Sequence, residues 1–166
     1  MEEGVEIRIK AKKSGNGYID YEAVVDPPRG NFIRVYGYTR GNVIQMEQAL
    51  RHALRGESLP ASAEEVAVKV IRQVLSCFSN NKVEKASVCM SVEEPDMTIC
   101  AEVYYRIQGI ASLASTVRGP GGVHRVERVV PMLDGELMDY VDKLTKEMIF
   151  VTRYAYNIWK EASRNV

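Results

Sequence analysis

Apolar and polar residues alternate on both sides of a glycine-rich turn near the N-terminus. The alternation covers residues 5–25, and Ser14-Gly15-Asn16-Gly17 forms the turn between its two halves. A period of two predicts a β-hairpin with one buried face, and glycine and asparagine suit the turn because they accept positive φ angles. The resulting register pairs opposite charges across the hairpin: Lys12 with Asp20 and Lys10 with Glu22.

A second hairpin is predicted for residues 83–107, and its register is better defined. The two alternating segments are joined by a loop at residues 93–96. Pairing Val92 with Met97 makes one face of this hairpin entirely apolar, whereas a slip of one residue would mix the two faces. The apolar pattern therefore specifies the register strongly.

Two helices are predicted between the hairpins, because apolar residues there recur at helical spacing. The first begins at Asn42, with Gln45 as the reciprocal partner in a capping box. The second begins at Ser62, with Glu65 three residues later as a second capping box. Asn80 is expected to end the second helix.

The C-terminal segment, residues 134–163, predicts a long helix that begins at the cap residue Asp134. Its apolar residues recur with alternating spacings of four and three. We expect this stripe to cover the sheet rather than to form a coiled coil between chains. Shorter apolar segments predict three further strands: residues 32–38, 110–117 and 123–130.

These elements predict an α+β fold in a single domain over residues 1–166. An antiparallel sheet occupies residues 5–130, with two helices inserted between its hairpins. The order is ββ-αα-ββ with extra strands, and the long helix at residues 134–163 follows.

The composition is that of an ordinary soluble protein. The 166 residues are 46% hydrophobic and 27% charged, with 22 Lys and Arg against 22 Asp and Glu. Zero net charge provides no general attraction for nucleic acid or an acidic membrane, so any polyanion site has to be a local patch. No apolar stretch approaches the ~20 residues that span a bilayer. The acidic N-terminus differs from a signal peptide, and we expect a cytoplasmic protein that does not contact membranes.

Two of the three cysteines, Cys89 and Cys100, lie opposite each other in the register of the second hairpin. Two thiolates are half of a usual zinc site, but neither His52 nor His124 stands at a recognised spacing from them. Two small buried residues are the preferred interpretation, because free cysteine is often buried. A cross-strand disulfide is the third alternative, which a reducing cytoplasm disfavours. No metal or other cofactor is therefore expected.

The stretch from Arg29 to Arg40 combines three arginines and three aromatic residues with no acidic residue. On a strand, aromatic rings can stack on bases while arginines bind phosphates. The stretch resembles the ribonucleoprotein strand motif, with Val35 where that motif has glycine. The preferred alternative is a strand with aromatic core contacts and solvated arginines. The candidate nucleic-acid-binding residues are Arg29, Arg34, Tyr36, Tyr38 and Arg40.

A second basic segment, residues 118–125, is rich in glycine and joins the last two predicted strands. Glycines let backbone N–H groups approach an anion, and arginines add positive charge. The segment lacks the Gly-Lys-Ser/Thr ending of a phosphate-binding P-loop, and a flexible hairpin loop is the preferred alternative. The candidate ligand-binding residues are Glu102, Arg118, Gly121, Gly122, His124 and Arg125.

No motif in the chain indicates a reaction. A Gly-x-Ser-x-Gly motif is missing, and two histidines provide few bases for a serine or cysteine nucleophile. No catalytic residue is assigned, and whether the protein is an enzyme stays open.

The ββ-αα-ββ order of residues 5–107 resembles the tunnelling fold (T-fold), whose members include GTP cyclohydrolases, pterin synthases, nitrile reductases of queuosine synthesis and uricase. This resemblance implies subunits that join their sheets edge to edge and ligand sites at subunit interfaces. Residues 25–30 and 122–125 are also similar to two segments of type IB GTP cyclohydrolases, the second of which supplies a histidine. The metal-binding cysteine of that family has no counterpart in residues 110–115.

The first functional expectation is accordingly a T-fold-like homo-oligomer that binds a small anionic or heterocyclic ligand near residues 118–125. The resemblance implies a purine- or pterin-like molecule. The alternatives are an RNA- or nucleoprotein-associated module that uses the stretch from Arg29 to Arg40, and an assembly subunit without a site of its own.

Overall fold

The computed structural model describes residues 4–15, 17–28, 31–40, 42–56, 58–77, 84–106, 109–132 and 137–163. Strands and helices follow one another in this order: β1 (Glu6–Lys13), β2 (Ile19–Asp26), β3 (Ile33–Thr39), α1 (Val43–Ala53), α2 (Ala61–Ser76), β4 (Lys85–Val92), β5 (Met97–Arg106), β6 (Ile110–Gly119), β7 (Gly122–Pro131), the 3-10 helix η1 (Leu137–Tyr140) and α3 (Val141–Ser163).

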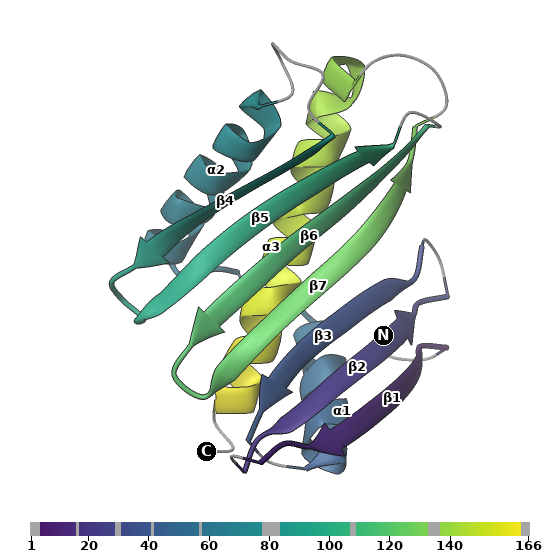
Figure 1. Ribbon diagram of the computed structural model, residues 1–166, viewed down its shortest axis with the longest axis vertical. Helices are drawn as coiled ribbons and strands as arrows, with labels where there is room; N and C mark the ends of the chain where they lie inside the picture. The colour runs from purple at the N-terminus through teal and green to yellow at the C-terminus, as the bar shows by residue number, and fades with distance from the viewer. Residues whose placement is uncertain are drawn as a thin grey trace.

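The strands form one seven-stranded antiparallel sheet in the order β1-β2-β3-β7-β6-β5-β4 (Figure 1). The predicted α+β fold and its long C-terminal helix are confirmed. The narrower ββ-αα-ββ order is not confirmed, because three strands precede the two helices and four follow them. Pairing of β3 with β7 joins the first three strands to the last four.

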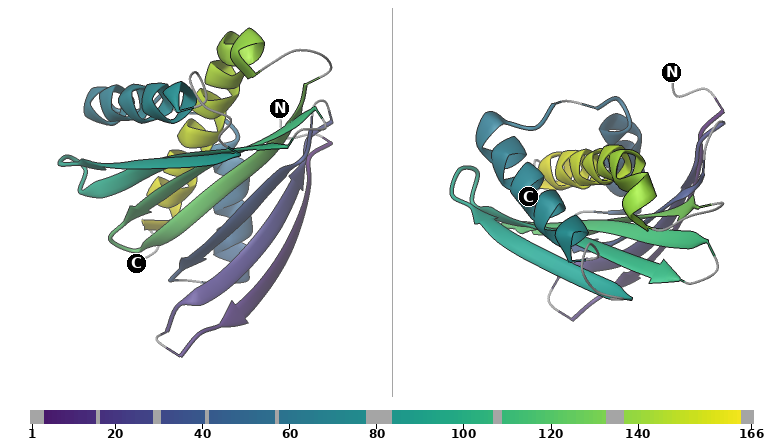
Figure 2. Two further views of the ribbon diagram at one scale, coloured as in Figure 1. Left: turned by 45° about the horizontal axis from the view of Figure 1, so that its top comes forward. Right: turned by 90° about the horizontal axis from the view of Figure 1, so that it is seen from above.

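All three helices lie on the same face of the sheet (Figure 2). α3 packs against β6 and β7, α2 packs against β4 and β5, and α1 packs against α3 and β1. We call the opposite face the open face, because no helix among the described residues covers it (Figures 1 and 2). Each strand therefore has one set of alternate residues in the core and one set directed away from the helices.

Both predicted hairpin registers are confirmed. In the first hairpin Lys12 pairs with Asp20, and in the second Val92 pairs with Met97. The apolar face of each hairpin is turned to the helices, as the period-two pattern predicts. The three further predicted strands are present as β3, β6 and β7.

The N-terminus of α1 has the predicted capping box. The Asn42 side chain accepts a hydrogen bond from the Gln45 N–H at 2.9 Å, and the Asn42 N–H donates to Gln45 Oε1 at 3.0 Å. Both bonds satisfy N–H groups that the helix itself leaves unpaired. The predicted helix ends at Asn80 and Asp134 lie outside the described residues.

The predicted capping box of the second helix is wrong. α2 begins at Ala61, its cap residue is Pro60, and no side chain caps it. The hydroxyl of Ser62 donates instead to the carbonyl oxygen of Glu94 at 2.6 Å, in the loop between β4 and β5. A tertiary hydrogen bond therefore uses the hydroxyl that the sequence pattern assigns to a local cap.

The apolar stripe of α3 covers the sheet, as predicted. The buried members of the stripe are Leu144, Met148, Val151, Ala155, Ile158 and Ala162. They join one continuous core with the helix-facing residues of the strands. Because these side chains are buried in the core of the chain, the stripe is not available for a coiled coil between chains.

Gly37 allows two side chains to meet across β3. In the register Gly37 stands between Tyr21 on β2 and His124 on β7. The hydroxyl of Tyr21 lies 2.6 Å from Nδ1 of His124. A Cβ at position 37 would collide with the carbonyl oxygen of Val123 and would lie 2.9 Å from Cε1 of Tyr21. The position requires a residue without a side chain.

We expect Gly37→Ala to lower the free energy of unfolding by about 1–3 kcal/mol, the usual cost of an overpacked core site. The carbonyl oxygen of Val123 belongs to the backbone of β7 and cannot move without disturbing the pairing of β3 with β7. Chemical denaturation measures the effect. Gly15→Ala is the matched control, since no atom lies within 4 Å of its Cβ position, and equal effects of the two changes would contradict this explanation.

Candidate functional site

The main feature of the open face is a group of aromatic and arginine side chains on and beside β3. We call this group the aromatic–arginine surface, and its members are Tyr18, Phe32, Arg34, Tyr36, Tyr38 and Arg40. Phe32 and Tyr38 are 43% and 42% exposed, values high for large rings. The surface runs along β3, an interior strand of the sheet that lies between β2 and β7.

The preferred sequence interpretation, a strand with aromatic core contacts, is wrong for Phe32 and Tyr38. The positions of β3 that face the helices are occupied by smaller or aliphatic residues: Ile33, Val35, Gly37 and Thr39. Of the predicted nucleic-acid-binding residues, the structure brings together four on or beside β3, and Arg29 lies outside the described residues.

Arginines stack on aromatic rings within this surface. Cζ of Arg34 lies 5.5 Å from the ring centroid of Phe32, and Cζ of Arg40 lies 5.0 Å from that of Tyr18. The rings of Tyr18 and Tyr38 meet edge to face, with centroids 5.5 Å apart. Distances below ~6 Å allow a cation–π attraction, so these contacts orient both the guanidinium groups and the rings.

The guanidinium group of Arg34 is exposed to solvent and lies beside Tyr36. A hydrogen bond with Tyr36, followed by the electrostatic effects of Tyr36, Glu127 and Glu22, raises the pKa of Arg34. On the adjoining strands, acidic residues of β2 stand opposite lysines of β1: Asp20 opposite Lys12 and Glu22 opposite Lys10. These two acids of β2 thus have lysines opposite them in the sheet, whereas Glu127 of β7 stands opposite Arg34 itself.

Directly beside Tyr36 on the open face, Arg125 of β7 is the centre of an ion-pair network. Its Nη2 lies 2.8 Å from Oε1 of Glu102, and its Nε lies 3.3 Å from Oε2 of Glu127. Nζ of Lys85 lies 3.8 Å from the same oxygen of Glu102. Glu102 and Arg125 are both predicted ligand-binding residues, and the structure brings them together as partners of each other.

The segment between the last two strands is a tight turn rather than an extended loop. β6 continues to Gly119 and β7 begins at Gly122, which leaves only Pro120-Gly121 between them. A Cβ at Gly122 would collide with the carbonyl oxygen of Tyr38. This glycine therefore permits close approach of β3 and β7, a structural role that the anion-binding interpretation did not consider.

The ligand-binding candidates of this segment lie on opposite faces of the sheet. Arg118 is exposed at the end of β6, and Arg125 is on the open face. His124 is fully buried among the residues that face the helices. Alternation along β7 separates these two neighbours, so they do not converge on one ligand within a single chain.

The buried pair of His124 and Tyr21 was not recognised from the sequence as a unit. Burial lowers the pKa of His124 to about 3, and burial followed by the nearby Tyr154 raises the pKa of Tyr21. His124 Nδ1 has the Tyr21 hydroxyl as its partner, whereas Nε2 has none among the described residues. The histidine is therefore neutral in the folded protein near neutral pH.

Cys89 and Cys100 form a disulfide across β4 and β5. The preferred interpretation from the sequence, two small buried residues without a bond between them, is wrong, although the predicted register correctly places the two cysteines opposite each other. Both thiols are consumed by the bond and are not free metal ligands. Among the residues that the structure describes, no group of three or more His, Cys, Asp or Glu side chains could hold a metal ion.

Comparisons with protein-family models, with curated proteins and with solved structures find no significant match to this chain. None of the helices in the described ranges combines the length and apolar character that crossing a membrane requires. The function therefore has to be inferred from the geometry of the chain itself.

The depressed pKa of His124 predicts a specific pH dependence of stability. The unfolded chain takes up a proton near pH 6.5, the ordinary value for histidine, whereas folded His124 does so only near pH 3. The contribution of His124 to the free energy of unfolding is thus fully present above pH ~6.5. It is lost as the pH falls toward 3, by about 1.4 kcal/mol per pH unit. Denaturant titrations at several pH values between these limits measure the slope.

His124→Gln is expected to make this slope shallower, because the glutamine does not titrate. The matched control is His52→Gln, since the other histidine of the chain is half exposed in its side chain. A slope that changes equally in both variants would show that His124 is not its source.

Proposed function

We propose that this protein binds single-stranded RNA on the open face of its sheet, through the aromatic–arginine surface. The observation that carries the proposal is the exposure of Tyr38 on the interior strand β3 and of Phe32 just before it, on the face that the helices leave uncovered. Aromatic side chains exposed on a sheet are the usual platform on which unpaired bases stack.

The chemistry of the surface suits unpaired nucleotides. Tyr36 and Tyr38 are alternate residues on one face of a strand, about 7 Å apart, and can stack successive bases. Arg34 and Arg40 already lie against aromatic rings, so fewer rotatable bonds have to be ordered when they bind phosphate groups. This preorganisation supports binding even though the whole chain carries no net charge.

Electrostatic attraction makes a modest contribution to the proposed affinity. The acids of β2 stand beside the surface, and each lies opposite a lysine of β1. Arg34 stands opposite Glu127, but that carboxylate is also bonded to Arg125. We infer that stacking provides most of the binding energy and that the arginines set the salt dependence.

We expect Tyr38→Ala to weaken binding of an unstructured single-stranded RNA about tenfold or more, since a stacked base contributes ~1–3 kcal/mol. Arg34→Ala is expected to reduce the slope of log K against log salt concentration by about 0.7, the value for one phosphate contact on a single strand. Fluorescence anisotropy at several salt concentrations measures both quantities.

Arg72→Ala provides the matched control, because Arg72 is an exposed arginine of α2 on the helix side of the sheet. Binding that is unchanged in both Tyr38→Ala and Arg34→Ala, or reduced as much in Arg72→Ala, would exclude this surface as the RNA site. If this surface instead binds a second copy of the chain, light scattering of the free protein would detect a dimer.

A second candidate is the T-fold-like homo-oligomer that binds a purine- or pterin-like molecule at a subunit interface. It is favoured by the two edge strands of the sheet, β1 and β4, each of which pairs with another strand on one side only among the described residues. Arg118 is exposed, while His124 is turned to the core, so such a site needs residues of a second subunit. This proposal includes the cytoplasmic location of the protein that the sequence predicts.

This candidate predicts that a purine, pterin or folate raises the melting temperature of the protein, because a ligand stabilises the folded state that binds it. The same ligand is expected to protect an oligomer that light scattering detects. A monomer whose melting temperature responds to none of these compounds would exclude the second candidate.

A further inference from the structure

The disulfide between Cys89 and Cys100 lies on the open face, at the β4 edge of the sheet (Figure 1). Cys89 belongs to the edge strand β4 and is exposed, whereas Cys100 belongs to the interior strand β5 and is partly buried. Their neighbours along the two strands, Val88 and Ile99, face the helices and pack in the core. The bond itself is thus outside the core, where a dissolved reagent can reach it.

The geometry of thiol–disulfide exchange makes the two sulfurs unequal. A thiolate attacks one sulfur along the line of the S–S bond, from the side opposite to the sulfur that leaves. The bond joins β4 to β5, so the line beyond Cys89 leads past β4, where the described sheet has no further strand. The line beyond Cys100 leads over β6, where Thr116 stands opposite Cys100. Sγ of Cys89 is therefore the accessible target.

The surroundings of Cys89 on the open face leave the approach clear. Its neighbours on the same face of β4, Ser87 and Ser91, are small and exposed. Glu102 stands opposite Ser87, but its carboxylate lies 2.8 Å from the guanidinium group of Arg125. The negative charge that would repel a thiolate is thus compensated, and access decides which sulfur reacts.

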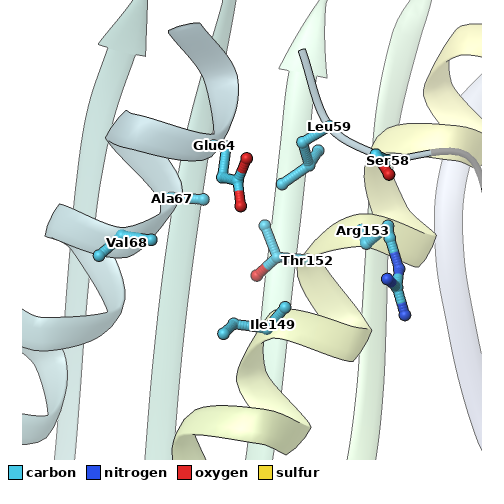
Figure 3. A pocket seen from close by; sticks show the side chains of 8 residues that line it. All are labelled: Ser58, Leu59, Glu64, Ala67, Val68, Ile149, Thr152 and Arg153. Carbon is cyan, nitrogen blue, oxygen red and sulfur yellow. The ribbon is translucent and has the colours of Figure 1, made fainter. Parts of the chain in front are cut away.

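The cavity on the helix side of the molecule takes no part in this reaction. It measures about 130 Å³ and lies between α2 and α3, beside residues 58–59 (Figure 3). The helices and the open face are on opposite sides of the sheet (Figure 2). A small thiol held in that cavity could not reach either sulfur, so the exchange proceeds from solvent at the edge of the sheet.

We propose that the Cys89–Cys100 disulfide is a reversible redox site at which low-molecular-weight thiols form a mixed disulfide with Cys89. The thiolate sulfur bonds to Sγ of Cys89, the bond between the two protein sulfurs breaks, and its electron pair leaves on Sγ of Cys100. A second thiolate attacks the small-molecule sulfur of the mixed disulfide and releases Cys89. Both cysteines take up protons from water, so the protein gains two electrons while two small thiols are oxidised to one disulfide.

The hairpin is held by other contacts when this bond is broken. β4 pairs with β5 from Lys85 to Val92 and packs against α2, and the apolar face of the hairpin specifies the register. The two thiols therefore stay opposite each other, and the bond can form again. A disulfide of this kind agrees with the cytoplasmic location that the sequence predicts, since cytosolic disulfides are usually transient and redox-sensing or catalytic.

The redox proposal does not depend on RNA binding. In the strand order, β6 and β7 separate the disulfide on β4 and β5 from the aromatic–arginine surface on and beside β3. Failure of either proposal leaves the other standing, because the test of the redox site involves no RNA.

The test uses reduced glutathione as the probe and the full chain with Cys77→Ser, because Cys77 is an exposed free thiol. Exchange is stopped with acid after a small fraction of the protein has reacted, and mass mapping of acid-stable peptic peptides locates the adduct. We expect glutathione on Cys89 in about tenfold or greater excess over Cys100, since access controls the attack. The matched control is the same chain unfolded in guanidinium chloride, where both sulfurs are accessible and this preference is expected to disappear.

Cys100→Ser in the same background tests the return step. After treatment with glutathione disulfide it is expected to keep the adduct on Cys89, because the thiol that displaces glutathione is missing. The chain that has both cysteines is expected to release glutathione and to close the Cys89–Cys100 bond. The reduced chain is expected to melt cooperatively.

Equal adducts on the two cysteines of the folded chain would overturn the proposal, as would exchange only at denaturant concentrations that unfold the protein. Loss of cooperative melting on reduction, or a glutathione adduct that persists when both cysteines are present, would overturn its reversibility.

Discussion

The pairing of β3 with β7 is the contact on which the rest of this structure depends. It joins residues far apart in the chain, such as Val35 and Val126, and turns two separate groups of strands into one sheet. Such long-range pairing has a high entropic cost before its contacts form. The strands approach so closely that there is no room for a side chain at Gly37 or Gly122. Across Gly37, the hydroxyl of Tyr21 on β2 contacts His124 on β7.

Because one sheet results, every strand has the same two environments. The face toward the helices is apolar and holds α3 over β6 and β7. The open face carries charges and exposed rings, among them the ion pair of Arg125 with Glu102 and the exposed side chain of Tyr38. The proposed RNA-binding surface follows this division, since it uses only the open face.

Buried polar groups show how the core accommodates exceptions. His124 has one partner and stays neutral, because burial lowers its pKa to about 3. The hydroxyl of Ser115 donates a hydrogen bond to the carbonyl oxygen of Cys100 at 3.0 Å, so its partner lies within the sheet. The hydroxyl of Thr152 has no hydrogen-bond partner among the described residues, although Thr152 is as deeply buried as the other two residues.

The sequence by itself determined the local elements of this protein, and the tertiary structure decided how they are used. Period-two alternation predicted the strands and both hairpin registers, including Cys89 opposite Cys100, because a slip of one residue would expose apolar side chains. It did not reveal the pairing of β3 with β7, which depends on the whole chain. Nor did it reveal that Ser62 bonds a distant loop instead of capping α2. The faces of β3 were ambiguous for the same reason, since a pattern assigns two faces to a strand but only the position of the helices decides which face is buried.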